Sequence, residues 1–98
     1  MHIVSEKTIL TYANKHPEAT TSFKTWVRTV RSSKWSKDAD LKFTYNDADY
    51  VGNGRYVFNI NFNNYRIVAK VQFGDKKVYI RFVGSHSEYN KIKGIENL

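Results

Sequence analysis

A short segment, residues 85–89, combines side chains that transfer protons with groups that bind anions. Ser85 and Glu88 match a capping box, in which a serine begins a helix and a glutamate is its third residue. His86 then lies in the first helical turn, where the helix dipole disfavours a charged imidazolium. We therefore expect a neutral imidazole near pH 7 that can accept a proton or hold a phosphate, beside exposed helix N–H groups that also bind phosphate. Tyr89 follows three residues later, on the same helix face as His86.

Three segments before this helix start predict strands that place cations and amides on one face. Residues 56–62, 65–73 and 77–83 alternate with period two. One set of alternating positions is apolar and predicts a core face: Tyr56, Phe58, Ile60, Phe62, Tyr65, Ile67, Ala69, Val71, Phe73, Val78, Ile80 and Phe82. The opposite face has almost no carboxylates and is suited to a phosphodiester backbone. This face also has valines, among them Val83. Its polar residues include Asn59, Asn61, Arg66, Lys70, Gln72, Tyr79 and Arg81.

These residue types fit the cleavage of RNA without a metal ion. That reaction needs an activated 2′-hydroxyl, stabilised charge on the phosphorus oxygens and a proton for the leaving 5′-oxygen. Arg66, Lys70 and Arg81 can stabilise the charge, and His86 and Tyr89 can transfer protons. The same residues also allow simpler interpretations. Strand cations often serve only solubility, a histidine at a helix start can be a surface residue, and the tyrosine ring can simply pack against the sheet.

Length and charge narrow the class of protein. The 98 residues predict a single domain, residues 1–98. The net charge is +7, and most of it lies after Tyr50, where eight Lys or Arg face only three Asp or Glu. A small basic domain usually binds nucleic acid, an anionic membrane or an acidic partner. No apolar run reaches the length of a membrane helix, so we expect no membrane association.

The remaining composition predicts a cytoplasmic protein without a bound metal. The sequence has no cysteine, which fits a reducing compartment, and its first residues do not form a signal peptide. The three histidines are scattered without a ligand pair, so a metal site is not expected. Gly52-Asn53-Gly54 predicts a tight turn and lacks the Lys-Ser/Thr of a phosphate-binding loop.

The N-terminal half predicts a strand and two helices. Ile3 and Val4 form a short strand, and Ser5 is the expected N-cap of a helix over residues 6–15. Pro17 suits the first turn of the second helix, which ends at residues 32–33. The apolar spacing of that helix is i, i+3, i+4 and i+7, at Phe23, Trp26, Val27 and Val30.

The predicted architecture is α+β, with a small, mainly antiparallel sheet in the order β-α-α-loop-β-β-β-α. Residues 35–50 gather four aspartates and predict a loop with short turns. Asn63-Asn64 predicts a two-residue hairpin, and residues 74–76 predict a longer one. We expect the two N-terminal helices to cover one sheet face and the opposite face to stay open.

Several segments resemble the HigB-type toxins of bacterial type II toxin–antitoxin modules, which are RelE-like. The resemblance extends over nearly the whole chain, and its most specific part is residues 80–92. It implies a RelE-like fold and cleavage of mRNA without a metal or other cofactor, often on the ribosome. It also implies inhibition by a HigA-type antitoxin with a helix-turn-helix domain. The similar segments are residues 1–5, 51–55, 57–60, Asn64-Tyr65-Arg66-Ile67-Val68 and 80–92.

The resemblance also implies roles for single residues. Tyr65-Arg66 is similar to the strand motif whose arginine contacts the scissile phosphate in RelE-like toxins. Tyr89 matches a C-terminal tyrosine implicated in catalysis, whereas Gly84-Ser85-His86 falls where some relatives have an arginine.

The chain departs from RelE-branch relatives at two strand positions, where those proteins have lysines and this sequence has Asn59 and Asn61. The general base is therefore either Lys70 or His86. The remaining polar residues are expected to contact RNA: Arg55, Asn59, Asn61, Gln72, Tyr79 and Lys91.

The leading hypothesis is a ribosome-associated endoribonuclease toxin that cuts mRNA by attack of the 2′-hydroxyl. The main alternative is a non-catalytic basic module that recognises RNA or an acidic protein. A third interpretation is an inactive remnant of a toxin.

Overall fold

The N-terminal third follows its sequence pattern closely. The computed structural model describes residues 1–98, which begin with β1 (His2–Val4), α1 (Glu6–Asn14), the short 3-10 turn η1 (Pro17–Ala19) and α2 (Thr20–Ser32). The four apolar residues with helical spacing on α2 are all buried, so this prediction is confirmed. Ser5 is not a side-chain cap. Its φ is 70°, in the left-handed region, and its hydroxyl makes no hydrogen bond to the helix.

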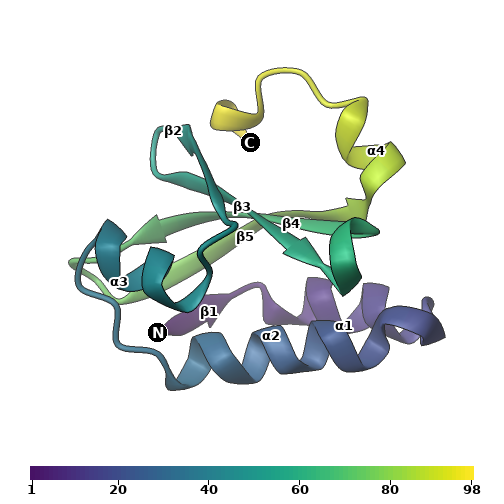
Figure 1. The fold of residues 1–98 in the computed structure, drawn as a ribbon, viewed down its shortest axis with the longest axis horizontal. Coiled ribbons are helices and arrows are strands. Elements are labelled where there is room, and N and C mark those ends of the chain that lie inside the picture. Colours follow the sequence, from purple (N-terminus) through teal and green to yellow (C-terminus); the bar gives the residue numbers. More distant parts are fainter.

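The sheet is mixed and has five strands in the order β1-β5-β4-β3-β2. β1 runs parallel to β5, and the other neighbouring pairs are antiparallel. α1 and α2 lie together on one face of the sheet (Figure 1). The predicted α+β class and the helix-covered face are therefore confirmed. The remaining strands are β2 (Asp49–Gly52), β3 (Arg55–Ile60), β4 (Tyr65–Gln72) and β5 (Lys77–Ser85).

The aspartate-rich stretch is more ordered than predicted. It contains the helix α3 (Asp38–Thr44) and the first two residues of the edge strand β2, Asp49 and Tyr50. On α3 only Leu41 is buried, so the helix has no repeated apolar spacing to reveal it. Asp49 and Tyr50 on β2 are both exposed, so this strand lacks the alternation of a half-buried strand. The expectation of a loop was wrong because α3 is anchored by the buried Leu41 and β2 by its pairing with β3, and neither element has a repeated pattern of its own.

The connection between β3 and β4 also differs from the predicted hairpin. β3 ends at Ile60, and a 3-10 turn, η2 (Asn61–Asn63), leads into β4. Phe62 was expected in the core, but it has φ of 68° and its side chain is 93% exposed. Asn61 and Asn63 also have positive φ, which asparagine tolerates better than most residues. The strand therefore ends at Ile60, although the period-two pattern of the sequence continues to Phe62.

An irregular register in β5 changes which side chains face the core. Val68 pairs with Phe82 while the next residue, Ala69, pairs with Ile80, so Arg81 is an extra residue in a β-bulge. Phe82 therefore shares the face of Val68, and Val83 packs against the core instead. The predicted sides of Phe82 and Val83 were wrong because an inserted residue reverses the alternation.

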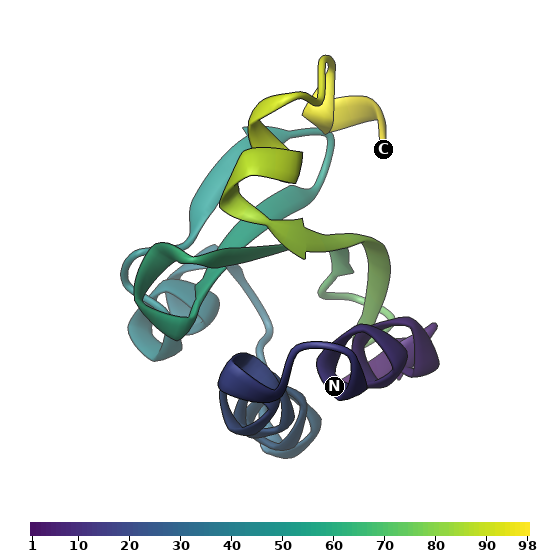
Figure 2. The same cartoon turned by 90° about the vertical axis from the view of Figure 1, so that its right-hand side faces the viewer.

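The second face of the sheet is covered in part. The short helix α4 (His86–Asn90) and the turn η3 (Ile95–Asn97) lie across it, opposite α1 and α2 (Figures 1 and 2). Arg55 donates two hydrogen bonds to the Leu98 carbonyl, at 3.0 and 2.6 Å. Val57 and Val68 face this side and are nevertheless buried. The expected open face is thus open only in part.

The bulge makes a testable prediction about stability. We expect Val83→Asp to lower the free energy of unfolding by more than about 2 kcal/mol, because it places an unpaired charge against the core. Phe82→Asp should cost less, since its carboxylate can reach water on the opposite face. Urea unfolding followed by circular dichroism measures both. If β5 alternated strictly and had no bulge, Phe82→Asp would lower the free energy of unfolding more than Val83→Asp.

Candidate active site

The side chain of Arg66 is the only buried charged group. It projects from β4 between Asn59 on β3 and Gly84 on β5. Its Nη1 donates to the carbonyl of Asn63 at 2.6 Å and to that of Tyr65 at 3.2 Å. No carboxylate pairs with it, because the single ion pair of the structure joins Arg31 to Glu6. The positive charge of the guanidinium is therefore held in place but not neutralised.

His86 lies against this guanidinium. Arg66 Nη2 and His86 Nδ1 are 2.8 Å apart. An arginine can only donate hydrogen bonds, so Nδ1 presents its lone pair, and the proton of the neutral ring is on Nε2. The backbone N–H of His86 donates to the Asn64 carbonyl at 2.9 Å. This second contact fixes the start of α4 to the β3–β4 connection.

Tyr89 completes the cluster of Arg66, His86 and Tyr89, which we call the Arg66 cluster. The Arg66 Cζ atom lies 5.7 Å from the centre of the Tyr89 ring, within the range of a cation–π contact. Burial raises the pKa of the Tyr89 phenol, while the Arg66 charge lowers it and Asp49 raises it again. The net pKa shift is upward, so the phenol keeps its proton at neutral pH. It is therefore a hydrogen-bond or proton donor rather than a base.

The predicted capping box is present at the start of α4. Glu88 N–H donates to Ser85 Oγ at 3.1 Å, and Ser85 N–H donates to Glu88 Oε1 at 2.8 Å. The Ser85 N–H, followed by the Tyr12 hydroxyl, lowers the pKa of the Glu88 carboxyl. Glu88 therefore stays a carboxylate at neutral pH and holds the helix start in one arrangement.

Sequence reasoning missed the contact that ties α4 to α1. The Tyr12 hydroxyl donates to Glu88 Oε1 at 2.9 Å, across 76 residues of sequence. Burial and this hydrogen bond raise the pKa of Tyr12 far above its usual range. The Tyr12 ring stacks on His16 and meets the edge of Tyr65, with ring centres 3.9 and 6.0 Å apart. No local motif marks Tyr12. Only its helical spacing from Ile9 on α1 indicates that it faces the core.

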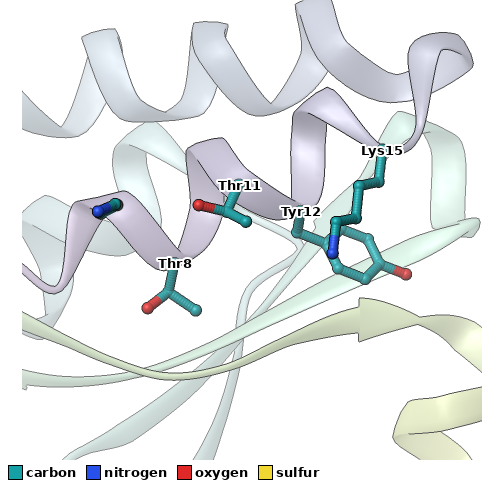
Figure 3. Close-up of a pocket in the computed structure, with 5 residues that line it drawn as sticks. Thr8, Thr11, Tyr12 and Lys15 are labelled. Atoms are coloured by element: carbon teal, nitrogen blue, oxygen red, sulfur yellow. The ribbon is translucent and has the colours of Figure 1, made fainter.

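A hollow of about 410 Å³ lies on the side of α1 that faces β5 (Figure 3). The Tyr12 ring forms part of its wall, but none of the predicted site residues lines it. The remaining lining residues are Lys7, Thr8, Thr11 and Lys15. No hollow of the structure is lined by Arg66, His86 or Tyr89.

Lys70 and Arg81 lie away from the Arg66 cluster. Lys70 is four residues further along β4, which corresponds to roughly 13 Å. It pairs with Arg55 on β3 and Tyr79 on β5, and the side chains of Lys70 and Arg81 make neither a hydrogen bond nor an ion pair. The Arg81 Cζ atom lies 5.6 Å from the centre of the Tyr79 ring. The structure therefore divides the predicted catalytic residues into two groups.

The predicted RNA-contacting residues are also dispersed. Arg55 is bonded to the Leu98 carbonyl, and Gln72 pairs with Lys77 at the far end of β4. Lys91 follows the last residue of α4 and is exposed.

The two asparagines differ in position. Asn59 faces Arg66, but its amide is 3.3 Å from the Asp47 carboxylate. Asn61 has left the strand, and its side-chain oxygen lies 3.5 Å from the Ser22 hydroxyl on α2. Asn61 is therefore not on the cationic face where the period-two pattern placed it.

The structure has neither a metal-binding cluster nor a membrane-spanning helix. No group of three or more His, Cys, Asp or Glu side chains is placed to hold a metal ion. None of the helices has both the length and the apolar character that crossing a membrane requires.

Comparison with known proteins identifies the family. The HigB toxin family, described as the RelE-like toxic component of a toxin–antitoxin system, matches residues 19–92. The mRNA interferase toxin HigB of Escherichia coli (strain K12) is 33% identical over 93 residues, which are 92% of this chain and 88% of that protein. The mRNA interferase HigB of Shigella flexneri has the same identity and coverage.

A more distant relative matches over a similar span. The mRNA interferase HigB of Escherichia coli O6:H1 is 24% identical over 94 residues, which are 94% of this chain and 91% of that protein. The family match includes all residues of the Arg66 cluster. The chain therefore belongs to the HigB family of RelE-like toxins of toxin–antitoxin systems.

Proposed function

We propose that this protein is an endoribonuclease toxin that cleaves mRNA in the cytoplasm and thereby stops translation. The names of its relatives as mRNA interferases support the substrate and the reaction. The observation that carries the proposal most directly is the buried Arg66 guanidinium, which has carbonyl and imidazole partners but no counter-charge. A buried cation without an anion is costly, and a phosphodiester group supplies the missing negative charge.

The reaction follows from the two neighbours of that guanidinium. When the scissile phosphate binds, Arg66 Nη2 turns to a phosphate oxygen and releases His86 Nδ1. The freed lone pair accepts the 2′-hydroxyl proton, the 2′-oxygen bonds to phosphorus, and the bond from phosphorus to the 5′-oxygen breaks. Tyr89, which is protonated at neutral pH, gives its proton to the leaving 5′-oxygen. The products are a 2′,3′-cyclic phosphate and a 5′-hydroxyl end.

The position of Lys70 favours His86 over Lys70 as the general base. His86 contacts Arg66 directly, whereas Lys70 lies roughly 13 Å further along β4. Lys70, Arg81 and Tyr79 instead form a cationic and aromatic surface along which the RNA backbone continues. This division assigns the chemistry to one end of the sheet and substrate binding to the other.

Two partners complete the proposal. The net charge of +7 suits the ribosome, whose RNA is anionic, as the place where mRNA is presented. The family match to a toxic component supports a neutralising antitoxin, and we propose that it is of the HigA type with a helix-turn-helix domain.

Substitution in the Arg66 cluster tests the chemistry. We expect Arg66→Ala to lower the cleavage rate by about 10²–10³ and His86→Ala by about 10²–10⁴, and both should relieve growth arrest. Lys24→Ala, an exposed cation on α2, is the matched control and should leave cleavage unchanged. New mRNA 5′ ends are mapped after the protein is added to translating ribosomes, and circular dichroism confirms that each variant folds. Full toxicity of both variants at matched expression would reject the assignments.

The chemistry of the ends tests the mechanism separately. We expect cleavage to continue in excess EDTA, to stop when the nucleotide at the cut carries a 2′-deoxy sugar, and to leave 5′-hydroxyl ends. Such ends ligate to an adapter only after treatment with a kinase. Ends that ligate without the kinase carry a 5′-phosphate and would exclude attack by the 2′-hydroxyl. Salt-sensitive binding without any new ends would instead favour a non-catalytic RNA-binding module.

Substitution of Lys70 tests whether this residue binds the substrate or acts in catalysis. The substrate concentration that gives half-maximal rate rises with salt, and the logarithm of one plotted against the logarithm of the other gives a slope. We expect Lys70→Met to reduce that slope by about one unit, because one phosphate contact is lost. The maximal rate should change by less than about tenfold, because proton transfer is assigned to His86. A series of cleavage rates at increasing salt measures both quantities. A loss of maximal rate as large as that of His86→Ala would make Lys70 the base.

A further inference from the structure

The connection between β3 and β4 has an unfavourable backbone at three consecutive residues. Asn61, Phe62 and Asn63 have φ of 53°, 68° and 131°. Asparagine adopts positive φ with little strain, but a bulky aromatic residue in this region is a genuine outlier. Backbone strain of this kind tends to persist where the surroundings impose it, and it gathers at functional sites.

The contacts that impose this backbone come from the Arg66 cluster. Arg66 Nη1 donates to the Asn63 carbonyl at 2.6 Å, and the His86 N–H donates to the Asn64 carbonyl at 2.9 Å. The Asn64 N–H in turn donates to the Asn61 carbonyl at 3.2 Å. Phe62 is thus held in a fixed loop, one residue away from the carbonyl that binds Arg66.

The ring of Phe62 makes no contribution to the core. Its side chain is 93% exposed, although residues on either side of the loop, Ile60 and Tyr65, are buried. Phe43 on α3 is exposed to the same extent, but α3 takes no part in the Arg66 cluster. An exposed ring on a strained loop beside an uncompensated cation needs a role outside the folding of the chain.

We propose that Phe62 is a stacking platform for an unpaired base of the RNA next to the scissile phosphate. The proposal rests on the endoribonuclease function proposed above. Proteins that bind single-stranded RNA combine cations for the backbone with exposed aromatic rings on which bases stack. Here Arg66 takes the phosphate, and Phe62 takes the flat face of a neighbouring base. The stack orients the nucleotide so that its linkage lies at His86 and Tyr89.

Three substitutions separate the ring from the backbone strain. Phe62→Leu keeps a bulky apolar side chain at positive φ but removes the aromatic face. Phe62→Tyr keeps that face, and Phe62→Gly removes both the ring and the strain. Phe43→Leu is the matched control, because it removes an equally exposed ring far from the Arg66 cluster.

The assay is single-turnover cleavage of mRNA bound to ribosomes, with the toxin in excess and its concentration varied. We expect Phe62→Leu and Phe62→Gly to raise the half-saturating toxin concentration by about 5- to 150-fold, the range for the loss of one stacked base. Phe62→Tyr and Phe43→Leu should behave as wild type. An mRNA with an abasic nucleotide beside the cut should weaken wild-type cleavage by a similar factor and leave Phe62→Leu almost unaffected.

Each contrary outcome has a distinct meaning. Wild-type half-saturation in Phe62→Leu, or an abasic effect equal in both proteins, would overturn the stacking role while the endoribonuclease function stands. Failure of the wild-type protein to produce any new ends would overturn the function and, with it, this inference. Unchanged cleavage by Phe62→Leu together with lost neutralisation by the antitoxin would make Phe62 a protein-docking residue. Thermal unfolding of all variants shows whether a change arises from misfolding.

Discussion

The guanidinium of Arg66 is the group on which the geometry of the site depends. A buried arginine must satisfy its N–H groups, and here it does so with the carbonyls of Asn63 and Tyr65 and the imidazole of His86. Removing it leaves those acceptors without partners in a partly buried place, at a cost of about 1–3 kcal/mol for each. The same side chain therefore shapes the β3–β4 connection and orients His86, and in the proposed mechanism it also provides the positive charge for the substrate.

α4 is too short to position the imidazole by itself. It has five residues, and an isolated helix of that length is not stable in water. Its place is determined by the capping box, the hydrogen bond from His86 N–H to Asn64, and the Tyr12 hydroxyl on Glu88. These contacts join α4 to the end of β5, the β3–β4 connection and α1. Catalytic groups held before the substrate arrives need little reorganisation during the reaction.

The proposed mechanism assigns two tasks to different parts of the sheet. At the end near α4, one buried cation, an imidazole and a protonated phenol lie together. Further along the strands, Lys70 and Arg81 form no ion pair and lie near Tyr79. Asp47, which accepts a hydrogen bond from the amide of Asn59 on β3, adds a negative charge beside this strand. In the proposed mechanism, repulsion from this carboxylate favours an RNA path over the cationic strands and away from Asp47.

The sequence alone was sufficient for features that depend on neighbours along the chain. The helical spacing on α2, the capping box of α4 and the strands rich in cations all repeat at the period of their own element. The fold class and the common helix face of His86 and Tyr89 followed from these patterns, whereas the contact of both residues with Arg66, and the separation of Lys70 from them, came from the structure. The family resemblance added the reaction.

Only the tertiary structure decided the features that depend on distant residues. The bulge at Arg81 reverses the sides of Phe82 and Val83, and no periodic pattern contains an inserted residue. The turn that exposes Phe62 is held by Arg66 and His86, and the bond from Tyr12 to Glu88 joins residues 76 positions apart. A local pattern reports which face of an element is apolar. It carries no information on which carbonyl, hydroxyl or carboxylate from a distant part of the chain will contact that element. Those contacts are determined only when the elements pack together.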